Sequence, residues 1–317
     1  MQFQSIRFTA LQPGPRLIVT GAVHGNETCG THAIRRIVTE FETGRLALIR
    51  GLVTFVPITN PKAYALGRRS GDRNLNRKLA PTEAPREFED QVANWLCPLL
   101  AEHEVLLDLH SFQAKGRPFV MVGPTDNDGP LEPTVHAAKE EALARRLGVQ
   151  RAVDGWLSTY ARGVERRQAF AAAHPGVPVD LDPRYGIGTT EYMRSTGGWA
   201  LTLECGQHED PGAPEVAYDA IRRTLAHLGL IDAPDPVPQT KMESLHLYEV
   251  VDKLDAADRF SRSWTSFDPV RRGDLIGTRA DGSPVHAEED GHIVFPNAAA
   301  GAGQEWFYLA KATSRFA

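Results

Sequence analysis

The stretch RLIVTGAVHGNETCG (residues 16–30) decides the fold class, because an apolar run leads into a polar turn and then into a helical pattern. Residues 16–23 have the length and apolar content of a buried strand. Beyond the turn, apolar residues recur at helical spacing at Ile34, Ile37, Val38 and Phe41. In open α/β sheets, ligand sites form where a strand ends and its helix begins. The stretch therefore predicts a strand–turn–helix unit that places polar side chains at such an edge.

Strand and helix patterns continue to alternate to about residue 230, which predicts an α/β domain over residues 1–231. We expect a mostly parallel sheet with helices on its faces. Residues 60–82 are polar and aperiodic, and we expect one long loop there. Further strands are predicted at 51–58, 104–110, 117–123 and 199–205, and helices at 88–99, 134–147, 157–173 and 214–229.

The character of the sequence changes after DAPDPVPQT (residues 232–240), which shows no periodicity and is the best candidate for a linker. Residues 241–317 contain short apolar runs that are separated by Gly, Asp and Pro. This pattern predicts a smaller all-β domain at the C-terminal end.

Composition narrows the class of protein. Hydrophobic residues make up 42% and charged residues 24% of the 317 residues, which is typical of a globular protein. A net charge of −5 argues against nucleic acid as the main partner, and no apolar run approaches the roughly 20 residues of a membrane span. The first residues show no signal-peptide pattern, and three cysteines without metal spacing indicate reduced thiols. We therefore expect a cytoplasmic protein.

His24 and Glu27 are three residues apart in the first turn, so the turn can direct both side chains at one atom. An imidazole and a carboxylate are two of the three protein ligands of a His₂Glu catalytic zinc site. Such a pair also occurs by chance, so the hypothesis depends on a third ligand from elsewhere in the chain.

The predicted strand that ends in DLHSF (residues 108–112) offers this third ligand. Asp108 and His110 are two residues apart and therefore face the same side of a strand. His110 can complete the zinc site, and Asp108 can accept a hydrogen bond from a ligating imidazole and fix its tautomer. The alternative is a structural histidine at a strand end.

Two further polar features lie near the same predicted edge. Glu204 ends the apolar strand 199–205, where an unpaired carboxylate would be costly to bury without a use. It could be the general base for a zinc-activated water, or it could pair with an arginine. The loop GRRSGDRNLNRKL (67–79) carries four arginines, which bind carboxylates bidentately. We expect Arg68 and Arg73 to be solvated.

Five motifs follow one another in chain order: GAVHGNE (21–27), NPKA (60–63), DRNLNR (72–77), DLHS (108–111) and LECG (203–206). In this set the sequence resembles the succinylglutamate desuccinylase/aspartoacylase family, a branch of the zinc carboxypeptidase-like hydrolases. The resemblance implies a mixed sheet flanked by helices, followed by a β domain that caps the site. It also implies one Zn²⁺ per chain on His24, Glu27 and His110, with Glu204 as the catalytic carboxylate.

The resemblance implies roles for five more residues. Arg69 resembles the arginine that polarises the scissile carbonyl, and Asn76 and Arg77 resemble the clamp for the substrate's α-carboxylate. Arg194 resembles the arginine that completes the substrate pocket. Tyr308 resembles a tyrosine of the C-terminal domain that reaches the site. Residues 124–190 match neither named subgroup, although they should shape the acyl pocket.

We therefore predict a zinc-dependent amidohydrolase that cleaves the amide bond of a small N-acyl amino acid. Zinc would lower the pKa of bound water to roughly 7, and Glu204 would pass its proton to the leaving amine. Two alternatives stay open: a metallocarboxypeptidase that acts on small peptides, and a catalytically inactive protein that binds acyl amino acids. Neither nucleic acid nor a membrane is an expected partner, and an oligomer is compatible with the sequence.

Overall fold

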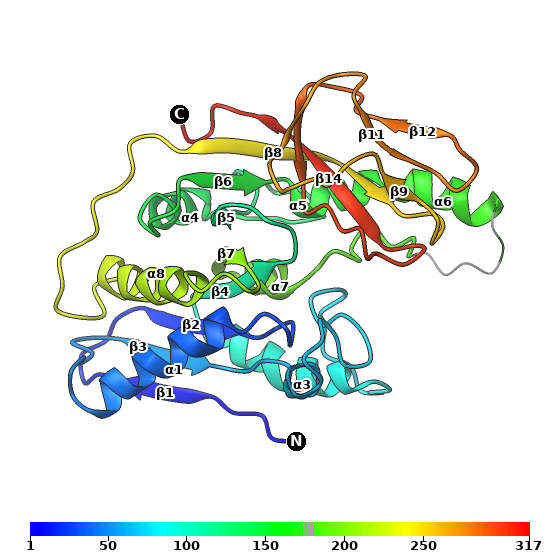
Figure 1. The fold of residues 1–317 in the computed structure, drawn as a ribbon. Coiled ribbons are helices and arrows are strands. Elements are labelled where there is room, and N and C mark those ends of the chain that lie inside the picture. Colours follow the sequence, from blue (N-terminus) through cyan, green and yellow to red (C-terminus); the bar gives the residue numbers. More distant parts are fainter. Residues whose placement is uncertain (174, 176–179) are drawn as a thin grey trace.

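The computed structural model describes residues 1–173, 175 and 180–317 (Figure 1). The strands up to residue 230 are β1 (Ile6–Thr9), β2 (Arg16–Gly21), β3 (Leu52–Val56), β4 (Val105–Phe112), β5 (Phe119–Met121), β6 (Arg151–Asp154) and β7 (Trp199–Gln207). The helices are α1 (Cys29–Glu42), α2 (Pro61–Leu66), α3 (Phe88–Ala101), α4 (Ala137–Ala144), α5 (Trp156–Arg162), α6 (Val164–Ala173), α7 (Thr189–Ser195) and α8 (Ala213–His227). The later strands are β8 (Glu243–Asp252), β9 (Arg259–Phe260), β10 (Pro269–Val270), β11 (Leu275–Thr278), β12 (Pro284–His286), β13 (Gly291–Val294) and β14 (Glu305–Ala312).

Eleven of the described strands form one mixed sheet in the order β1-β3-β2-β4-β7-β5-β6-β8-β14-β13-β10. In its centre β3, β2, β4 and β7 run parallel, and β5 pairs antiparallel with β7. The strands β12, β11 and β9 form a separate small sheet. The predicted α/β class, with a mixed sheet and added strands at the C-terminal end, is confirmed.

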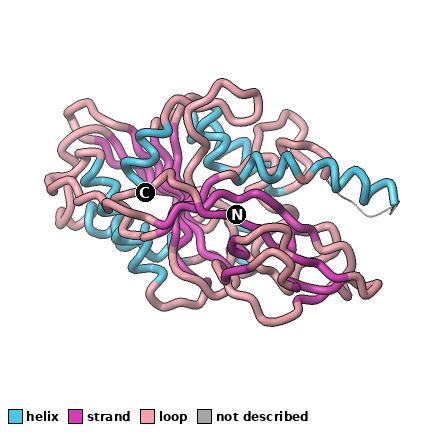
Figure 2. The backbone as a smooth tube through the Cα atoms, turned by 90° about the horizontal axis from the view of Figure 1, so that it is seen from above, coloured by secondary structure: helices cyan, strands magenta, loops and turns pink. Residues whose placement is uncertain are grey.

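Helices cover both faces of the central strands (Figures 1 and 2). Leu17 and Val19 of β2 pack in the layer that contains α1, α4 and α8, whereas Ile18 packs in the layer of α3 and α7. Successive side chains of a strand point to opposite faces, so a strand that is covered on both sides must be apolar throughout. This explains the uninterrupted apolar run that begins at Leu17.

The parallel strands β2, β4 and β7 end at the same edge of the sheet. His110 of β4 pairs in register with Glu204 of β7, and Asp108 pairs with Thr20 of β2. Polar residues that are far apart in the sequence therefore meet at the carboxyl ends of the strands, where α/β sheets bind ligands.

The strands after residue 240 continue the main sheet. Residues 232–240 contain no helix or strand. β8 then pairs parallel with β6 and antiparallel with β14, so hydrogen bonding runs without a break from β1 to β10. The division into domains at 232–240 remains a prediction.

The region 60–82, predicted as one loop, contains the helix α2. Asn60 caps this helix by accepting a hydrogen bond from the Ala63 N–H at 3.1 Å, and Pro61 occupies the first helical position. Gly67 ends the helix in the left-handed conformation, with φ at 59°. These are ordinary start and stop signals, but six residues are too few for apolar periodicity to reveal a helix.

The other differences concern short elements. β1, β6 and α7 form where no element is predicted, and the helix predicted over 157–173 is divided at Gly163 into α5 and α6. Four-residue strands such as β6 are too short to show alternation. Among the described residues, no helix combines the length and apolar content that crossing a bilayer requires.

Candidate active site

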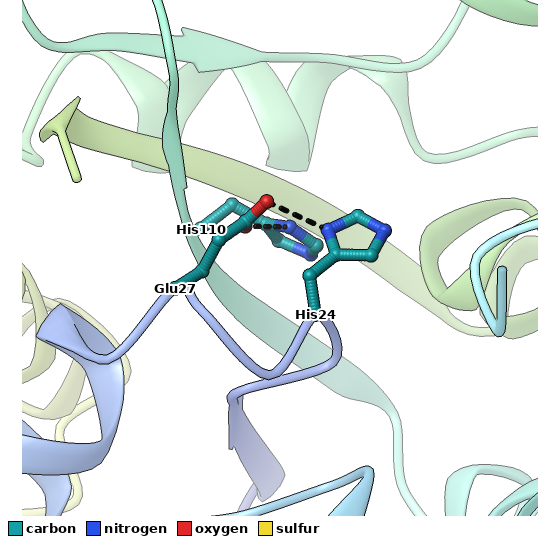
Figure 3. Close-up of side chains that lie close together, drawn as sticks. All are labelled: His24, Glu27 and His110. Carbon is teal, nitrogen blue, oxygen red and sulfur yellow. Dashed lines mark hydrogen bonds and ion pairs between the residues drawn. The ribbon is translucent and has the colours of Figure 1, made fainter. Parts of the chain in front are cut away.

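His24, Glu27 and His110 come together at the carboxyl edge of the sheet (Figure 3). His24 and Glu27 lie in the turn after β2, and His110 lies near the end of β4. One ligand atom from each side chain lies within 4.8 Å of the other two, and all three residues are buried. Two imidazoles and a carboxylate are the donor set of a three-ligand catalytic zinc site.

Close backbone packing fixes the turn that carries the first two residues. A Cβ atom at Gly25 would lie 1.9 Å from the carbonyl carbon of Ala63, so only glycine fits there. Ala22 adopts the left-handed conformation with φ at 48°, which is uncommon for a residue with a side chain and typical of functional turns. The Glu27 N–H donates to the His24 carbonyl oxygen at 3.1 Å and closes the turn.

Each imidazole directs its Nδ1 atom at Glu27. His24 Nδ1 is 2.8 Å from one carboxylate oxygen of Glu27, and His110 Nδ1 is 2.8 Å from the other (Figure 3). The Nε2 atoms bind elsewhere: that of His24 is 3.0 Å from Oδ1 of Asn74, and that of His110 is 2.8 Å from Oδ2 of Asp108. These outer bonds orient both rings so that both Nδ1 atoms can serve as metal ligands.

The three central groups have displaced pKa values. Burial, helped by Arg69, lowers the pKa of His24 to about 4. Burial also acts against protonation of His110, but Asp108 and Glu27 outweigh it and raise the pKa well above its usual value. For Glu27, burial is outweighed by the two imidazoles, which hold the pKa well below its usual range. The cluster therefore holds its carboxylate ionised and ready to bind a cation.

Asp108 is held by two further hydroxyl groups. Thr20 Oγ1 donates to its Oδ1 at 2.6 Å, and Thr189 Oγ1 donates to its Oδ2. The side chain is fully buried. These bonds, together with His110, satisfy the carboxylate and fix it behind the imidazole, as predicted from the spacing of Asp108 and His110.

Glu204 differs from these carboxylates in the surroundings of one of its oxygens. Its Oε2 atom is buried and has no hydrogen-bond partner among the described residues. Burial raises the pKa of Glu204 to about 8, despite the opposing effect of His110. A divalent cation on the neighbouring ligands would favour the ionised carboxylate and lower this pKa. A carboxyl group in such a position is suited to accept and release a proton.

A cavity of about 840 Å³ connects this cluster with the other predicted site residues. Arg69 reaches Oε1 of Glu27 at 3.0 Å while half of its side chain stays exposed. The cavity is lined by all nine predicted residues, namely His24, Glu27, Arg69, Asn76, Arg77, His110, Arg194, Glu204 and Tyr308. Their roles remain predictions, but the fold brings all of them to one place.

Arg77 is buried and paired with Glu305. Its Nη2 and Nε donate to Oε1 of Glu305 at 2.9 and 3.2 Å, and its Nη1 donates to the Asn76 carbonyl oxygen at 2.8 Å. The guanidinium carbon lies 4.9 Å from the centre of the Trp156 ring. Because a guanidinium has five N–H groups, one N–H on each terminal nitrogen remains for a ligand.

Tyr308 and Asn76 lie near this guanidinium. The Tyr308 hydroxyl is buried and has no hydrogen-bond partner among the described residues, and its ring centre is 5.2 Å from that of Trp156. Asn76 accepts a hydrogen bond from the Thr189 N–H at 2.9 Å, which fixes its amide. The surroundings of Arg77 thus contain polar groups that can bind an anion.

Arg194 lines the cavity but is enclosed by acidic groups. Its Nε and Nη2 donate to Glu140 at 2.7 and 3.1 Å, and its Nη1 donates to Glu132 at 2.8 Å. Nη2 also donates to the Ala200 carbonyl oxygen at 2.8 Å, and Glu191 lies 3.6 Å from Nη1. The side chain is 3% exposed. Four of its five N–H groups are therefore engaged within the protein.

The prediction of a solvated side chain is wrong for Arg73. Its guanidinium lies 3.1 Å from Glu87 and 2.8 Å from Asp90, at the start of α3, and donates to the Arg77 carbonyl oxygen at 3.0 Å. The loop packs on α3, so Arg73 holds the loop in place. Arg68 is exposed, as predicted.

Three residues of the site carry no assigned role in the sequence analysis: Asn74, Glu132 and Glu305. Asn74 lies in the DRNLNR motif, which was the available signal. Glu305 is 228 positions from Arg77, and Glu132 is 62 positions from Arg194. Pairs at such separations depend on the fold and cannot be found from local spacing.

Residues 13–143 match the family model of the succinylglutamate desuccinylase/aspartoacylase catalytic domain. No curated protein sequence matches the chain. The product-bound structure of the ectoine utilization protein EutE (DoeB) from Ruegeria pomeroyi is similar, with a TM-score of 0.71 and 18% identity over 97% of this chain and 88% of that chain. The structure of the succinylglutamate desuccinylase/aspartoacylase from Rhodobacter sphaeroides has a TM-score of 0.70 and 17% identity, over 99% of this chain and 90% of that chain. The structure of an aspartoacylase family protein from Mesorhizobium loti has a TM-score of 0.64 and 20% identity, over 99% of this chain and 90% of that chain.

The structural matches cover almost the whole chain. Because their sequence identities are low, they show that the fold is similar and nothing more. The family model covers the part that contains His24, Glu27, Arg69, Arg77 and His110. The motifs and the family model therefore make residues 13–143 similar to the succinylglutamate desuccinylase/aspartoacylase catalytic domain, and the whole chain shares the fold of structures that carry this family's name.

Proposed function

We propose that this protein is a zinc-dependent hydrolase that cleaves the amide bond of an N-acyl amino acid. One observation carries the proposal: a buried carboxyl oxygen of Glu204 has no hydrogen-bond partner in the described part of the chain, and Glu204 lies in the same cavity as, and directly beside, the cluster of His24, Glu27 and His110. Burying such a carboxyl without a partner is costly, and the cost is explained if the group takes part in a reaction.

The residues present fit a zinc ion. His24 and His110 direct Nδ1 at one carboxylate while their Nε2 atoms are held by Asn74 and Asp108, which is the outer support that metal-binding imidazoles usually have. His24, Glu27 and His110 would hold the metal. When bound, zinc lowers the pKa of water to roughly 7 and polarises a carbonyl group.

Glu204 and Arg69, which lie around the proposed metal position, have separate roles in the reaction. Glu204 takes the proton of the attacking water and returns it to the leaving amine, which is the function of a general base and acid. Arg69, half exposed beside Glu27, donates to the oxygen on which negative charge develops. Removing one such donor typically costs about 3–4 kcal/mol of transition-state stabilisation.

The substrate's α-carboxylate binds to the polar side chains around Arg77. Among the described residues, two N–H groups of Arg77 and the hydroxyl of Tyr308 have no partner, and the amide of Asn76 is fixed by Thr189. Residues 313–315 at the end of the chain also line the cavity. This enclosure favours a small acyl amino acid over the peptides of a metallocarboxypeptidase.

The test combines metal content with activity. The purified protein should contain about one zinc per chain, as a three-ligand open site requires. It should release a free amino acid from members of a panel of N-acetyl, N-succinyl and N-formyl amino acids. Removing zinc with a chelator should abolish the release, and added zinc should restore it.

Three results would count against this function. Zinc-loaded protein that hydrolyses none of the panel would leave only the hypothesis of an inactive binding protein. Faster cleavage of dipeptides than of acyl amino acids would favour the carboxypeptidase. Full zinc occupancy in both His24→Ala and His110→Ala would reject the ligand assignment.

A further inference from the structure

We propose that Glu132 closes the Arg194 end of the cavity to carboxylates, so that the substrates are acyl amino acids whose part facing Arg194, either the side chain or the acyl group, carries no negative charge. This inference rests on the proposed function and specifies its substrate class. It also specifies the part of Arg194 in the substrate pocket, which is that of a buried wall residue that binds no substrate anion.

The first argument is a count of donors. Four of the five N–H groups of Arg194 are used by Glu140, Glu132 and the Ala200 carbonyl, and the fifth, on Nη1, has Glu191 within 3.6 Å. A substrate carboxylate could bind this arginine only by displacing a buried carboxylate. Arg77 does not have this restriction, because two of its N–H groups have no partner in the part of the chain that the structure describes.

The second argument is the local charge. Three acidic side chains, Glu132, Glu140 and Glu191, surround the single positive charge of Arg194. Burial raises the pKa of Glu132 to about 7, and Glu191 and Glu140 contribute to this although Arg194 opposes them. Because charges interact strongly where water is scarce, a further carboxylate would be repelled here.

The third argument is position. Glu132 and Glu191 both line the cavity, together with Arg194, so these charges face the space that a substrate fills. Glu140 is buried behind them and also accepts a hydrogen bond from the Gly123 N–H at 2.7 Å. Since Glu140 keeps Arg194 in place, Glu132 can be replaced without leaving the guanidinium unpaired.

The negative charge to be rejected could belong to the amino-acid side chain or to the acyl group. Two pairs of compounds of equal shape separate these sources: N-acetylglutamine with N-acetylglutamate, and N-succinamoylalanine with N-succinylalanine. We expect the amide to have at least a tenfold higher kcat/KM than the acid in one pair or both. The pair that discriminates identifies the part of the substrate that faces Arg194.

Variants at Glu132 test whether this residue is responsible. Glu132→Ala frees one N–H group of Arg194, and Glu132→Gln removes the charge but keeps an acceptor. In both variants the ratio of kcat/KM for the amide to kcat/KM for the acid should fall by about tenfold. In Glu132→Ala, kcat/KM for the acid itself should rise. Glu42→Gln, an exposed position on α1, should leave the preference unchanged. A merely structural role for Glu132 would lower both rates together.

The possible failures are distinguishable. Equal or faster cleavage of the acid in both pairs would overturn the inference, as would an unchanged preference in Glu132→Gln with an unaltered melting temperature. If the zinc-loaded protein cleaves neither these compounds nor N-acetylalanine, the proposed function fails. Calorimetric titration with the same four compounds would then still decide whether the cavity binds the amide more tightly than the acid.

Discussion

At the scale of single residues, two buried carboxyl groups that line the same cavity, those of Glu27 and Glu204, are set apart by their partners. Glu27 is bonded to both imidazoles, to Arg69 and to the Ser111 N–H, and its pKa is well below the usual range. One oxygen of Glu204 has no hydrogen-bond partner within the described residues, and its pKa is raised to about 8. Environments that push two pKa values apart support the proposed roles of Glu27 as ligand and Glu204 as base.

This assignment predicts the behaviour of Glu204→Gln. The variant should keep its zinc, because Glu204 is not a ligand, while kcat falls by the roughly 10²–10⁴-fold that general-base catalysis supplies. Metal analysis and steady-state kinetics on the same preparation measure both effects. Glu209→Gln, at an exposed position five residues later, is the matched control. Loss of zinc from Glu204→Gln would show that Glu204 is a ligand.

Asn74, which contacts the proposed metal ligand His24, offers a second prediction. Its Oδ1 accepts from His24 and also from the Asn76 N–H at 2.9 Å. Asn74→Ala should weaken zinc binding by about 10–100-fold, as changes behind a metal ligand typically do. Competition with a zinc chelator measures the affinity. Arg68→Ala, on the same loop but exposed, should bind zinc like the unaltered protein.

At the scale of elements, a buried side chain at the start of α3 holds the loop 67–79 in addition to the ion pairs of Arg73. Glu89 accepts hydrogen bonds from the N–H groups of Gly71, Asp72 and Arg73, at 2.8–3.2 Å, and from the Asn60 side chain at 2.9 Å. The sequence predicts the helix and the polar stretch but not this contact. The loop therefore depends on Glu89 to bring its arginines to the cavity.

Glu89→Ala should both destabilise the protein and misplace the loop. It leaves buried donors without acceptors, for which a loss of about 3 kcal/mol in the free energy of unfolding is expected. Urea unfolding measures this loss, and kcat/KM should fall even where the variant is fully folded. Glu83→Ala, an exposed glutamate shortly before α3, should change neither quantity. Unchanged kinetics in folded Glu89→Ala would refute the positioning role.

The elements also show how far the sequence predicts this structure. β2, β4 and β7 were predictable because they are covered on both faces, which requires continuous apolar runs, and the motifs at their ends marked the site. The short elements α2 and β6 lacked periodicity. The pairing of Arg77 with Glu305 and of Arg194 with Glu132 was not predictable, because it depends on the fold that joins distant segments.

At the scale of the whole molecule, residues near the C-terminal end of the sequence contact residues that precede 232–240. Arg315 pairs with Asp154 at 2.7 Å and with Glu141 at 2.8 Å, and it donates to the Gly123 carbonyl oxygen at 2.7 Å. Phe316 is fully buried in the core layer of α1 and α8. Together with the pairing of β6 and β8, these contacts join residues on both sides of 232–240 into one packed structure.

We therefore expect the chain to unfold as one cooperative unit, although the sequence change at 232–240 predicts a boundary between domains there. Tryptophans report on both sides of this segment, since Trp95 and Trp199 precede it and Trp264 and Trp306 follow it. Fluorescence and far-ultraviolet circular dichroism should give coincident urea transitions, as an all-or-none process requires. Arg315→Ala should shift both curves to lower urea by the same amount, because it removes contacts that both halves share. Two separated transitions, with Arg315→Ala moving only one of them, would instead show that residues 241–317 unfold independently.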